Sequence, residues 1–171
     1  MKNLLVSLCL VLFFISCGSN TTSQGNTHAS SSSNESISFE LDGNAWATTG
    51  WGQYREADGR TYMNVNGTNT ANGMDQFGIK IHDFNGVGEY SPLGESGQNG
   101  FVLTFTSLNR STGTNQQYQV ADHTSIVKVT AFDPTTKIIS GEFNFTLKDR
   151  DGNIVLLTNG KFTDIELQVV N

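Results

Sequence analysis

Hydrophobic and polar residues alternate along most of the chain from residue 37 onward. In the segment 75–83, for example, Phe77, Ile79 and Ile81 fall on one side and His82 on the other. A period of two is typical of a β-strand with one buried face, and no segment shows a convincing helical period. Strands are therefore predicted at residues 37–41, 45–49, 61–66, 75–83, 86–90, 101–108, 125–132, 138–148 and 154–167.

Turn residues separate these strands at short intervals. Asp42-Gly43 and Asp151-Gly152 are dipeptides that tolerate the positive φ of tight hairpins, and Asp133-Pro134 fits the first two positions of a turn. Gly160 marks a β-bulge inside the last strand. Short strands with such turns predict an all-β fold, a single antiparallel β-sandwich or barrel-like domain.

The N-terminal segment has the pattern of an export signal. Lys2 precedes an apolar run from Leu4 to Ile15, which is shorter than the roughly 20 residues that span a bilayer. The run ends in Phe14-Ile15-Ser16-Cys17, which resembles a bacterial lipobox. This resemblance implies a lipoprotein signal peptide at 1–16 and an acylated Cys17, and two or more acyl chains anchor a protein stably. An ordinary secretory signal is the alternative.

A polar segment follows the cysteine. Residues 18–36 are rich in Ser, Thr, Asn and Gly and contain no large apolar side chain. Such a composition cannot bury enough surface to offset the entropy of ordering. We therefore predict a disordered, flexible tether at 17–36 and one β domain at 37–171.

Charge and cysteine content narrow the function classes. The chain has a formal net charge of −6 and no cluster of basic residues, which argues against a nucleic-acid partner. Its two cysteines are Cys9, inside the signal, and Cys17. The mature domain would then hold no disulfide, no cysteine-bound zinc and no thiol nucleophile.

Two stretches of the domain resemble a known family. The opening FELDGNAWAT and the closing segment from VKVTAFDPTTK to TNGKFTDI are similar to a Bacteroidetes lipoprotein family of unknown function, DUF6252. The resemblance covers about residues 37–166 and is most specific at 125–165. It implies a secreted or lipid-anchored β-rich domain, and no activity can be carried over.

A loop near the C-terminus has oxygen ligands at alternate positions. Asp149, Asp151 and Asn153 share the spacing of the first half of a calcium-binding loop. However, Gly160 stands where such a loop would place its bidentate glutamate. A hairpin turn explains the same residues without an ion. No cofactor is therefore predicted, with Ca²⁺ kept as the alternative.

Three aromatic residues lie close together in the sequence. Trp46, Trp51 and Tyr54 are candidates for stacking on sugar rings. Trp46 lies on an alternating strand and fits the core better, whereas Trp51 stands between two glycines and fits the surface. A glycan-binding face would show Trp51 and Tyr54 exposed side by side.

The sequence offers no marked catalytic motif. Ser125, His123 and Asp83 could be combined into a triad, but no nucleophile elbow or metal-binding histidine pair is present. An enzyme would show His82 or His123 in a pocket beside a carboxylate. The protein is therefore predicted not to be an enzyme. A hydrolytic enzyme is kept as a third hypothesis, after a binding or structural module and a glycan-binding module.

We expect a lipid-anchored protein of the cell envelope with a non-catalytic binding or structural β domain. Its partner would be an envelope protein or, in the alternative function, an extracellular glycan. Gly18 follows the cysteine and no acidic cluster comes after it. By resemblance to lipoprotein sorting rules, this favours the periplasmic face of the outer membrane over the cell surface.

Overall fold

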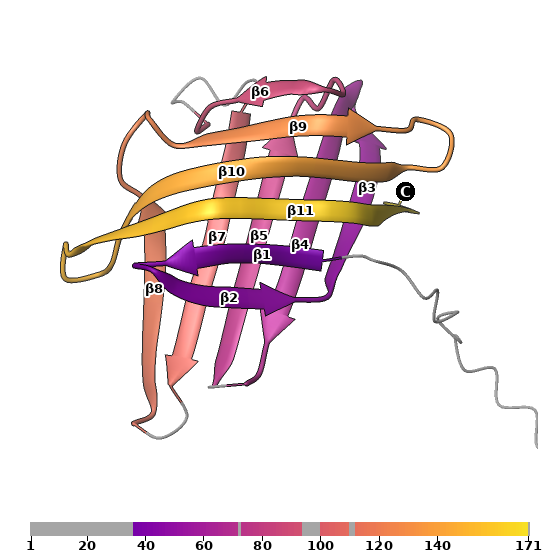
Figure 1. Ribbon diagram of the computed structural model, residues 1–171. Coiled ribbons are helices and arrows are strands. Elements are labelled where there is room, and N and C mark those ends of the chain that lie inside the picture. Colours follow the sequence, from indigo (N-terminus) through magenta and orange to yellow (C-terminus); the bar gives the residue numbers. More distant parts are fainter. Residues whose placement is uncertain (1–35, 72, 94–99, 110–111, 171) are drawn as a thin grey trace, which may run out of the picture. The chain divides into compact units, whose positions relative to one another are not determined.

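A computed structural model of the chain describes residues 36–71, 73–93, 100–109 and 112–170, and the predicted signal peptide, Cys17 and almost all of the tether lie outside these ranges. The regular secondary structure of the described residues consists entirely of β-strands (Figure 1), which confirms the all-β prediction. The strands are β1 (Ser36–Leu41), β2 (Asn44–Thr48), β3 (Gly50–Ala57), β4 (Arg60–Asn69), β5 (Met74–His82), β6 (Gly88–Tyr90), β7 (Gly100–Asn109), β8 (Thr114–Val120), β9 (Ile126–Phe132), β10 (Ile138–Lys148) and β11 (Ile154–Val170).

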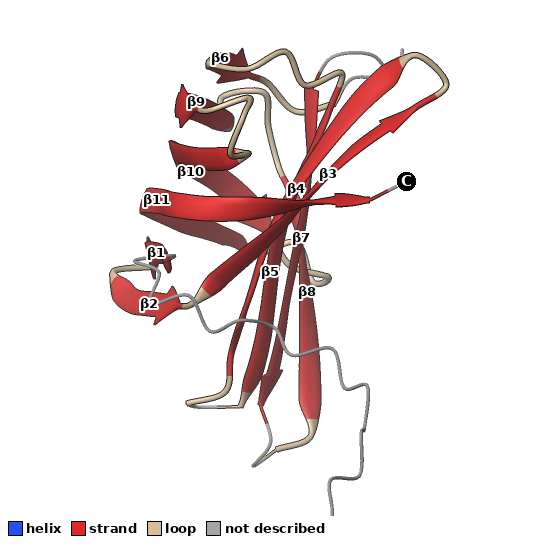
Figure 2. Ribbon diagram, turned by 90° about the vertical axis from the view of Figure 1, so that its right-hand side faces the viewer, coloured by secondary structure: helices blue, strands red, loops and turns tan. Residues whose placement is uncertain are grey.

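The strands form two layers that face each other (Figure 2). One layer has the order β2-β1-β11-β10-β9-β6, and the other has the order β3-β4-β5-β7-β8. The layers join at two places, where the end of β11 pairs with β3 and the end of β8 pairs with β10. The sheet therefore closes into a ring, as a sandwich with barrel-like joins. Most pairs are antiparallel, but β11 and β3 are parallel.

Two bulges bend β11, which belongs to both layers. Between Leu157 and Gly160, and again between Phe162 and Ile165, β11 advances three residues while β10 advances two. Asn159 and Asp164 sit in these intervals with φ of 54° and 50°, a conformation that Asn and Asp tolerate better than most residues. The bulge predicted at Gly160 is thus present. Because a bulge bends its strand, these insertions carry β11 from one layer to the other.

An aromatic cluster fills the space between the layers. Phe39 of β1 stacks on Trp46 with ring centroids 4.4 Å apart, and Phe77 of β5 stacks on Phe143 of β10 at 5.1 Å. Phe143 also stacks on Phe145 at 5.2 Å. These rings are almost completely buried. The cluster links strands of both layers, so it holds the sandwich together without a disulfide.

Two glycines make room for the rings of two buried phenylalanines, Phe143 and Phe162. Gly141 of β10 is paired with Phe162 of β11, and Phe143 of β10 is paired with Gly160 of β11. A Cβ atom on Gly160 would lie 2.3 Å from the Phe143 ring, and one on Gly141 would lie 2.3 Å from the Phe162 ring. Each phenylalanine therefore lies across the glycine of the opposite strand, in the space that a larger side chain would need.

The strand β3 was not predicted. Gly50 and Gly52 weaken the strand pattern of this segment, because glycine is disfavoured in strand interiors. In the structure, a Cβ atom on either glycine would lie 2.3 Å from a side chain of β11, Ile165 for Gly50 and Leu167 for Gly52. The glycines allow β3 to approach the end of β11 where the two layers join.

Candidate ligand-binding surface

The outer face of the layer β3-β4-β5-β7 has an unusual composition. Side chains alternate between the core and this face, so the strand register sets its rows. Within the described residues, its outward positions carry amide, hydroxyl, aromatic, aliphatic and basic side chains and no carboxylate. The outward residues include Trp51, Gln53, Arg55, Tyr62, Asn64, Asn66, Thr68, Gln76, Lys80, His82, Val102, Thr104 and Thr106.

Trp51 lies at one end of this face. Its side chain is 49% exposed, and it lines a pocket with Asn66, Gln76 and Thr104. Gly78 occupies the position between Asn66 and Thr104 in the same row, where an added Cβ atom would come within 2.8 Å of the Asn66 side-chain oxygen. The missing side chain makes room for the Asn66 amide at this position. An exposed indole beside amide and hydroxyl groups can stack on a sugar ring and hydrogen-bond its hydroxyls.

Tyr54 lies on the opposite face of β3 from Trp51. An odd spacing of three residues places two strand side chains on different faces. Tyr54 stacks on Phe132 with centroids 6.3 Å apart, the Lys137 Nζ atom lies 4.1 Å from its ring centre, and its hydroxyl donates to Glu56. The two rings therefore do not form one stacking surface.

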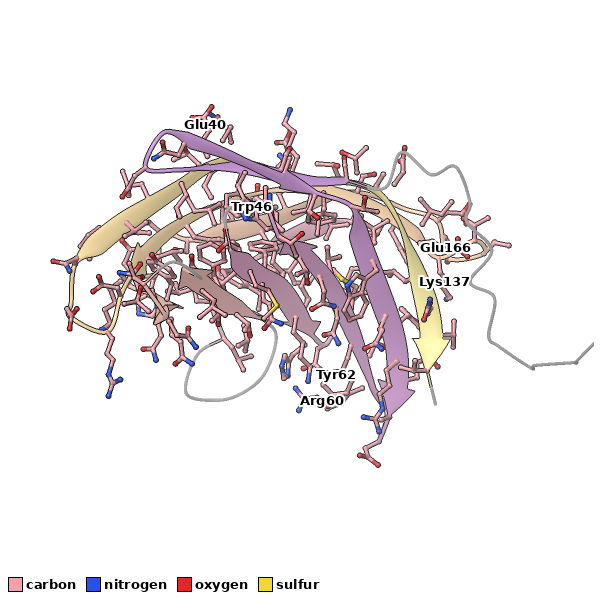
Figure 3. The ribbon with its side chains drawn as sticks, turned by 90° about the horizontal axis from the view of Figure 1, so that it is seen from below. Glu40, Trp46, Arg60, Tyr62, Lys137 and Glu166 are labelled. Carbon is pink, nitrogen blue, oxygen red and sulfur yellow. The ribbon has the colours of Figure 1, made fainter. Side chains whose placement is uncertain are left out.

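Trp46 belongs to the core, as the alternating pattern favoured. It is 7% exposed, and its Nε1 atom donates to the Asp75 carboxylate over 3.1 Å (Figure 3). The Ser107 hydroxyl donates to the other oxygen of Asp75. This bridge satisfies the buried indole and ties β2 to β5 and β7. Trp46 is thus placed to support the fold, below the surface that Trp51 reaches.

Basic residues gather around Tyr62 at the other end of the same face. The Lys80 Nζ atom lies 5.1 Å from the Tyr62 ring centre, the Arg60 guanidinium 5.8 Å, and the His82 ring packs edge-on at 5.3 Å. Figure 3 shows Tyr62 and Arg60 together at the lower edge of the molecule. Arg60 also forms a two-pronged ion pair with Asp83, at 2.6 and 2.8 Å. Tyr62 is thus the centre of a locally positive surface.

A pocket of about 560 Å³ opens beside this cluster. Arg55, Lys80, His82 and Asn64 line it, and the Asp58 carboxylate lines it as well. Burial lowers the pKa of His82 from its ordinary value, and the nearby positive charges of Lys80 and Arg60 lower it further. The lowered pKa favours the neutral form of the imidazole at pH 7. Sequence patterns could not reveal this cluster, because its members come from three strands whose register is needed to align them.

The loop with Asp149, Asp151 and Asn153 is a closed hairpin turn. The Asp149 carboxylate accepts hydrogen bonds from the amides of Asp151 and Asn153, at 2.9 and 2.8 Å, and from the Asn153 side chain at 2.9 Å. The Asn153 side chain and these amides hold the pKa of Asp149 below its ordinary value. Both carboxylate oxygens of Asp149 thus accept hydrogen bonds within the turn, as the hairpin interpretation requires.

Replacing Asp149 tests this role. Asp149→Ala is expected to lower the melting temperature at pH 7, because the carboxylate holds three donors of the turn. Because the pKa of Asp149 is lower in the folded protein than the ordinary value of about 3.9, the ionised carboxylate stabilises the fold at pH values above 3.9. This stabilisation is lost as the pH falls through the folded-state pKa of Asp149. The difference from wild type should therefore shrink below about pH 4, in melts recorded from pH 7 to pH 3. Stabilisation of wild type by Ca²⁺ that EDTA reverses would instead support the metal site.

The residues of the suggested triad have other partners. Ser125 is 2% exposed, and its hydroxyl accepts a hydrogen bond from the Thr146 amide. Asp83 pairs with Arg60. His123 shares a pocket with Asp122, but that carboxylate is held by the amide and the hydroxyl of Thr124. The pocket thus pairs a histidine with a carboxylate, as an enzyme would, but the buried Ser125 hydroxyl is poorly placed to act as a nucleophile there.

Comparison with known proteins gives no relative: no protein-family model, no curated protein and no solved structure matches the chain. Among the described residues, no three His, Cys, Asp or Glu side chains are grouped so that they could hold a metal ion. The same part of the chain has no helix of the length and hydrophobicity needed to cross a membrane.

Proposed function

We propose that this protein is a lipid-anchored protein of the bacterial cell envelope, and that its β domain is a non-catalytic binding or structural module. The observation that carries the proposal is the apolar run Leu4–Ile15 ending at Cys17, followed by a polar segment up to the first strand at Ser36. Acyl chains on Cys17 would hold the domain at the membrane. Gly18 after the cysteine favours the outer membrane as the site of anchoring, and the lack of an acidic cluster after Cys17 favours its periplasmic face.

The architecture of the described residues supports a passive role. The core is continuous and aromatic, and its buried residues come from strands of both layers. Polar side chains of the turns are used within the fold: Asp133, for instance, accepts from the amides of Thr135 and Thr136 at 2.7 and 3.2 Å. Such a domain suits binding or spacing at an envelope better than it suits chemistry.

The anchor is tested by replacing the acylated residue. Cys17→Ser is expected to move the protein from the membrane fraction to the soluble fraction, because serine cannot carry the thioether-linked lipid. Fractionation of cells followed by immunoblotting measures the shift. The matched control is Cys9→Ser, which changes the other cysteine and should leave the protein in the membrane fraction. Retention of Cys17→Ser in the membrane pellet would refute the anchor.

Recognition of an extracellular glycan is the second candidate function. The exposed Trp51 with Asn66, Gln76 and Thr104 favours it. Trp51→Ala is expected to abolish retention on a glycan array that wild-type protein binds, since the indole supplies the stacking surface. Leu156→Ala is a suitable control, because Leu156 is also 49% exposed but lies on β11, in the other layer.

A further inference from the structure

The outer face of β3-β4-β5 carries a group of basic residues, although the whole chain has a net negative charge. The chain carries 16 acidic and 10 basic residues, yet Arg55, Lys80 and Arg60 meet on this face beside His82. Two carboxylates are close: Asp83 pairs with Arg60, and Asp58 lines the pocket together with Arg55, Arg60 and Lys80. Positive charges that crowd together repel one another, so the cluster favours an anion that enters the pocket.

The pocket beside Tyr62 and the surface around Trp51 lie on the same strands, β3 and β4, and on the same face of the sheet. Arg55 is paired with Tyr62 in the strand register, and Trp51 is paired with Asn66. The two rows are four residues apart on the same strands, which is roughly 14 Å at about 3.4 Å per residue. Gln53 and Asn64 form the row between Arg55 and Trp51, and the Asn64 amide points toward the Gln53 carbonyl at 3.5 Å. Aromatic, amide and basic groups thus follow one another along β3 and β4.

We propose that the pocket around Tyr62 binds the acid group of an anionic oligosaccharide, and that another ring farther along the same oligosaccharide stacks on Trp51. Lys80 and Arg55 are the cations that face the acid group. His82 contributes a neutral ring nitrogen, and the amides of Gln53 and Asn64 hydrogen-bond sugar hydroxyls between the two ends. The acid group is a carboxylate or a sulfate, since both present negatively charged oxygens to the same donors. This inference rests on the glycan-binding function proposed above and names the class of glycan.

The test uses the mature acylated protein, from Cys17 onward, in a neutral detergent and matched pairs of oligosaccharides. One pair is oligogalacturonate and its methyl ester, and the other is a galactan oligosaccharide with and without sulfate. Calorimetric titration at low ionic strength is expected to show at least one acidic form binding about fivefold or more tightly than its neutral partner, the order expected for an exposed ion pair. The preference should shrink in added salt, which screens exposed charges.

Three variants locate the effect. Lys80→Ala is expected to weaken acidic binding by about fivefold and to leave neutral binding unchanged. Lys161→Ala removes an exposed lysine from β11 instead and should change neither. Lys80→Arg should keep the acidic preference, because it preserves the charge. Equal losses for Lys80→Ala and Lys161→Ala would overturn the assignment of the pocket.

A spectroscopic readout reports on the pocket independently of affinity. Binding of an anion beside His82 should raise the pKa of its imidazole, which Lys80 and Arg60 now depress. An NMR titration of the histidine ring should show this rise with the acidic oligosaccharide and none with the neutral one. Equal binding of acidic and neutral forms would overturn the acidic subsite while the glycan function stands. Binding of none of the four probes would count against both.

Discussion

Phe143→Ala is expected to lower the free energy of unfolding by about 3–5 kcal/mol, the range for removing a fully buried phenylalanine. Phe143 is 1% exposed and its ring contacts the rings of Phe39, Phe77 and Phe162, at centroid distances of 6.2, 5.1 and 6.3 Å. Removing it leaves a cavity at the place where β1, β5, β10 and β11 meet. Since a domain of this size is stable by only about 5–15 kcal/mol, the loss is a large fraction of the whole.

Denaturant unfolding followed by tryptophan fluorescence measures this loss, because Trp46 is buried close to the same cluster. Leu156→Ala removes an exposed aliphatic side chain and should cost far less. A cost below about 1 kcal/mol for Phe143→Ala would contradict a core centred on this residue.

Gly160→Ala is expected to destabilise the domain by about 1–3 kcal/mol, the usual cost of overpacking a filled core. The added methyl group would lie 2.3 Å from two carbons of the Phe143 ring and 2.6 Å from the Phe143 carbonyl oxygen. The ring must then leave the space across the glycine, and the β10–β11 pairing must move. Thermal melts of the purified protein provide the measurement.

The direct control is a double-mutant cycle with Phe143→Leu. Because the new methyl group and the Phe143 ring compete for one volume, the two changes together should cost less than the sum of the single variants. The compensation should be partial, since the close carbonyl oxygen of Phe143 remains. Strict additivity would show that the ring of Phe143 is not what excludes a side chain at Gly160.

The alternating pattern predicted most strands but could not predict how they close. Phe77, Ile79 and Ile81 have the period of two, and all three are buried. By contrast, β3 holds Gly50 and Gly52, whose role depends on contacts with Ile165 and Leu167 more than a hundred residues later. A local pattern holds no information about such contacts. The parallel pairing of β3 with β11 was invisible for the same reason.

The candidate surface was only partly predictable. The exposure of Trp51 follows from its position between two glycines, and the burial of Trp46 follows from its place on an alternating strand. The pairing of Trp51 with Tyr54 could not be judged until β3 was known to be a strand, because only then does their spacing place them on opposite faces. Lys80 and Tyr62 are 18 residues apart in sequence and meet only through the register of β4 and β5.

The central claim is that Cys17 carries the lipid that places this domain at the membrane. Mass spectrometry of the N-terminal peptide, taken from protein purified out of the membrane fraction, tests it most directly. We expect a peptide that begins at Cys17, without residues 1–16, and that carries two or three acyl chains on this residue. A mature N-terminus beyond residue 17, or a peptide with unmodified Cys17, would contradict it.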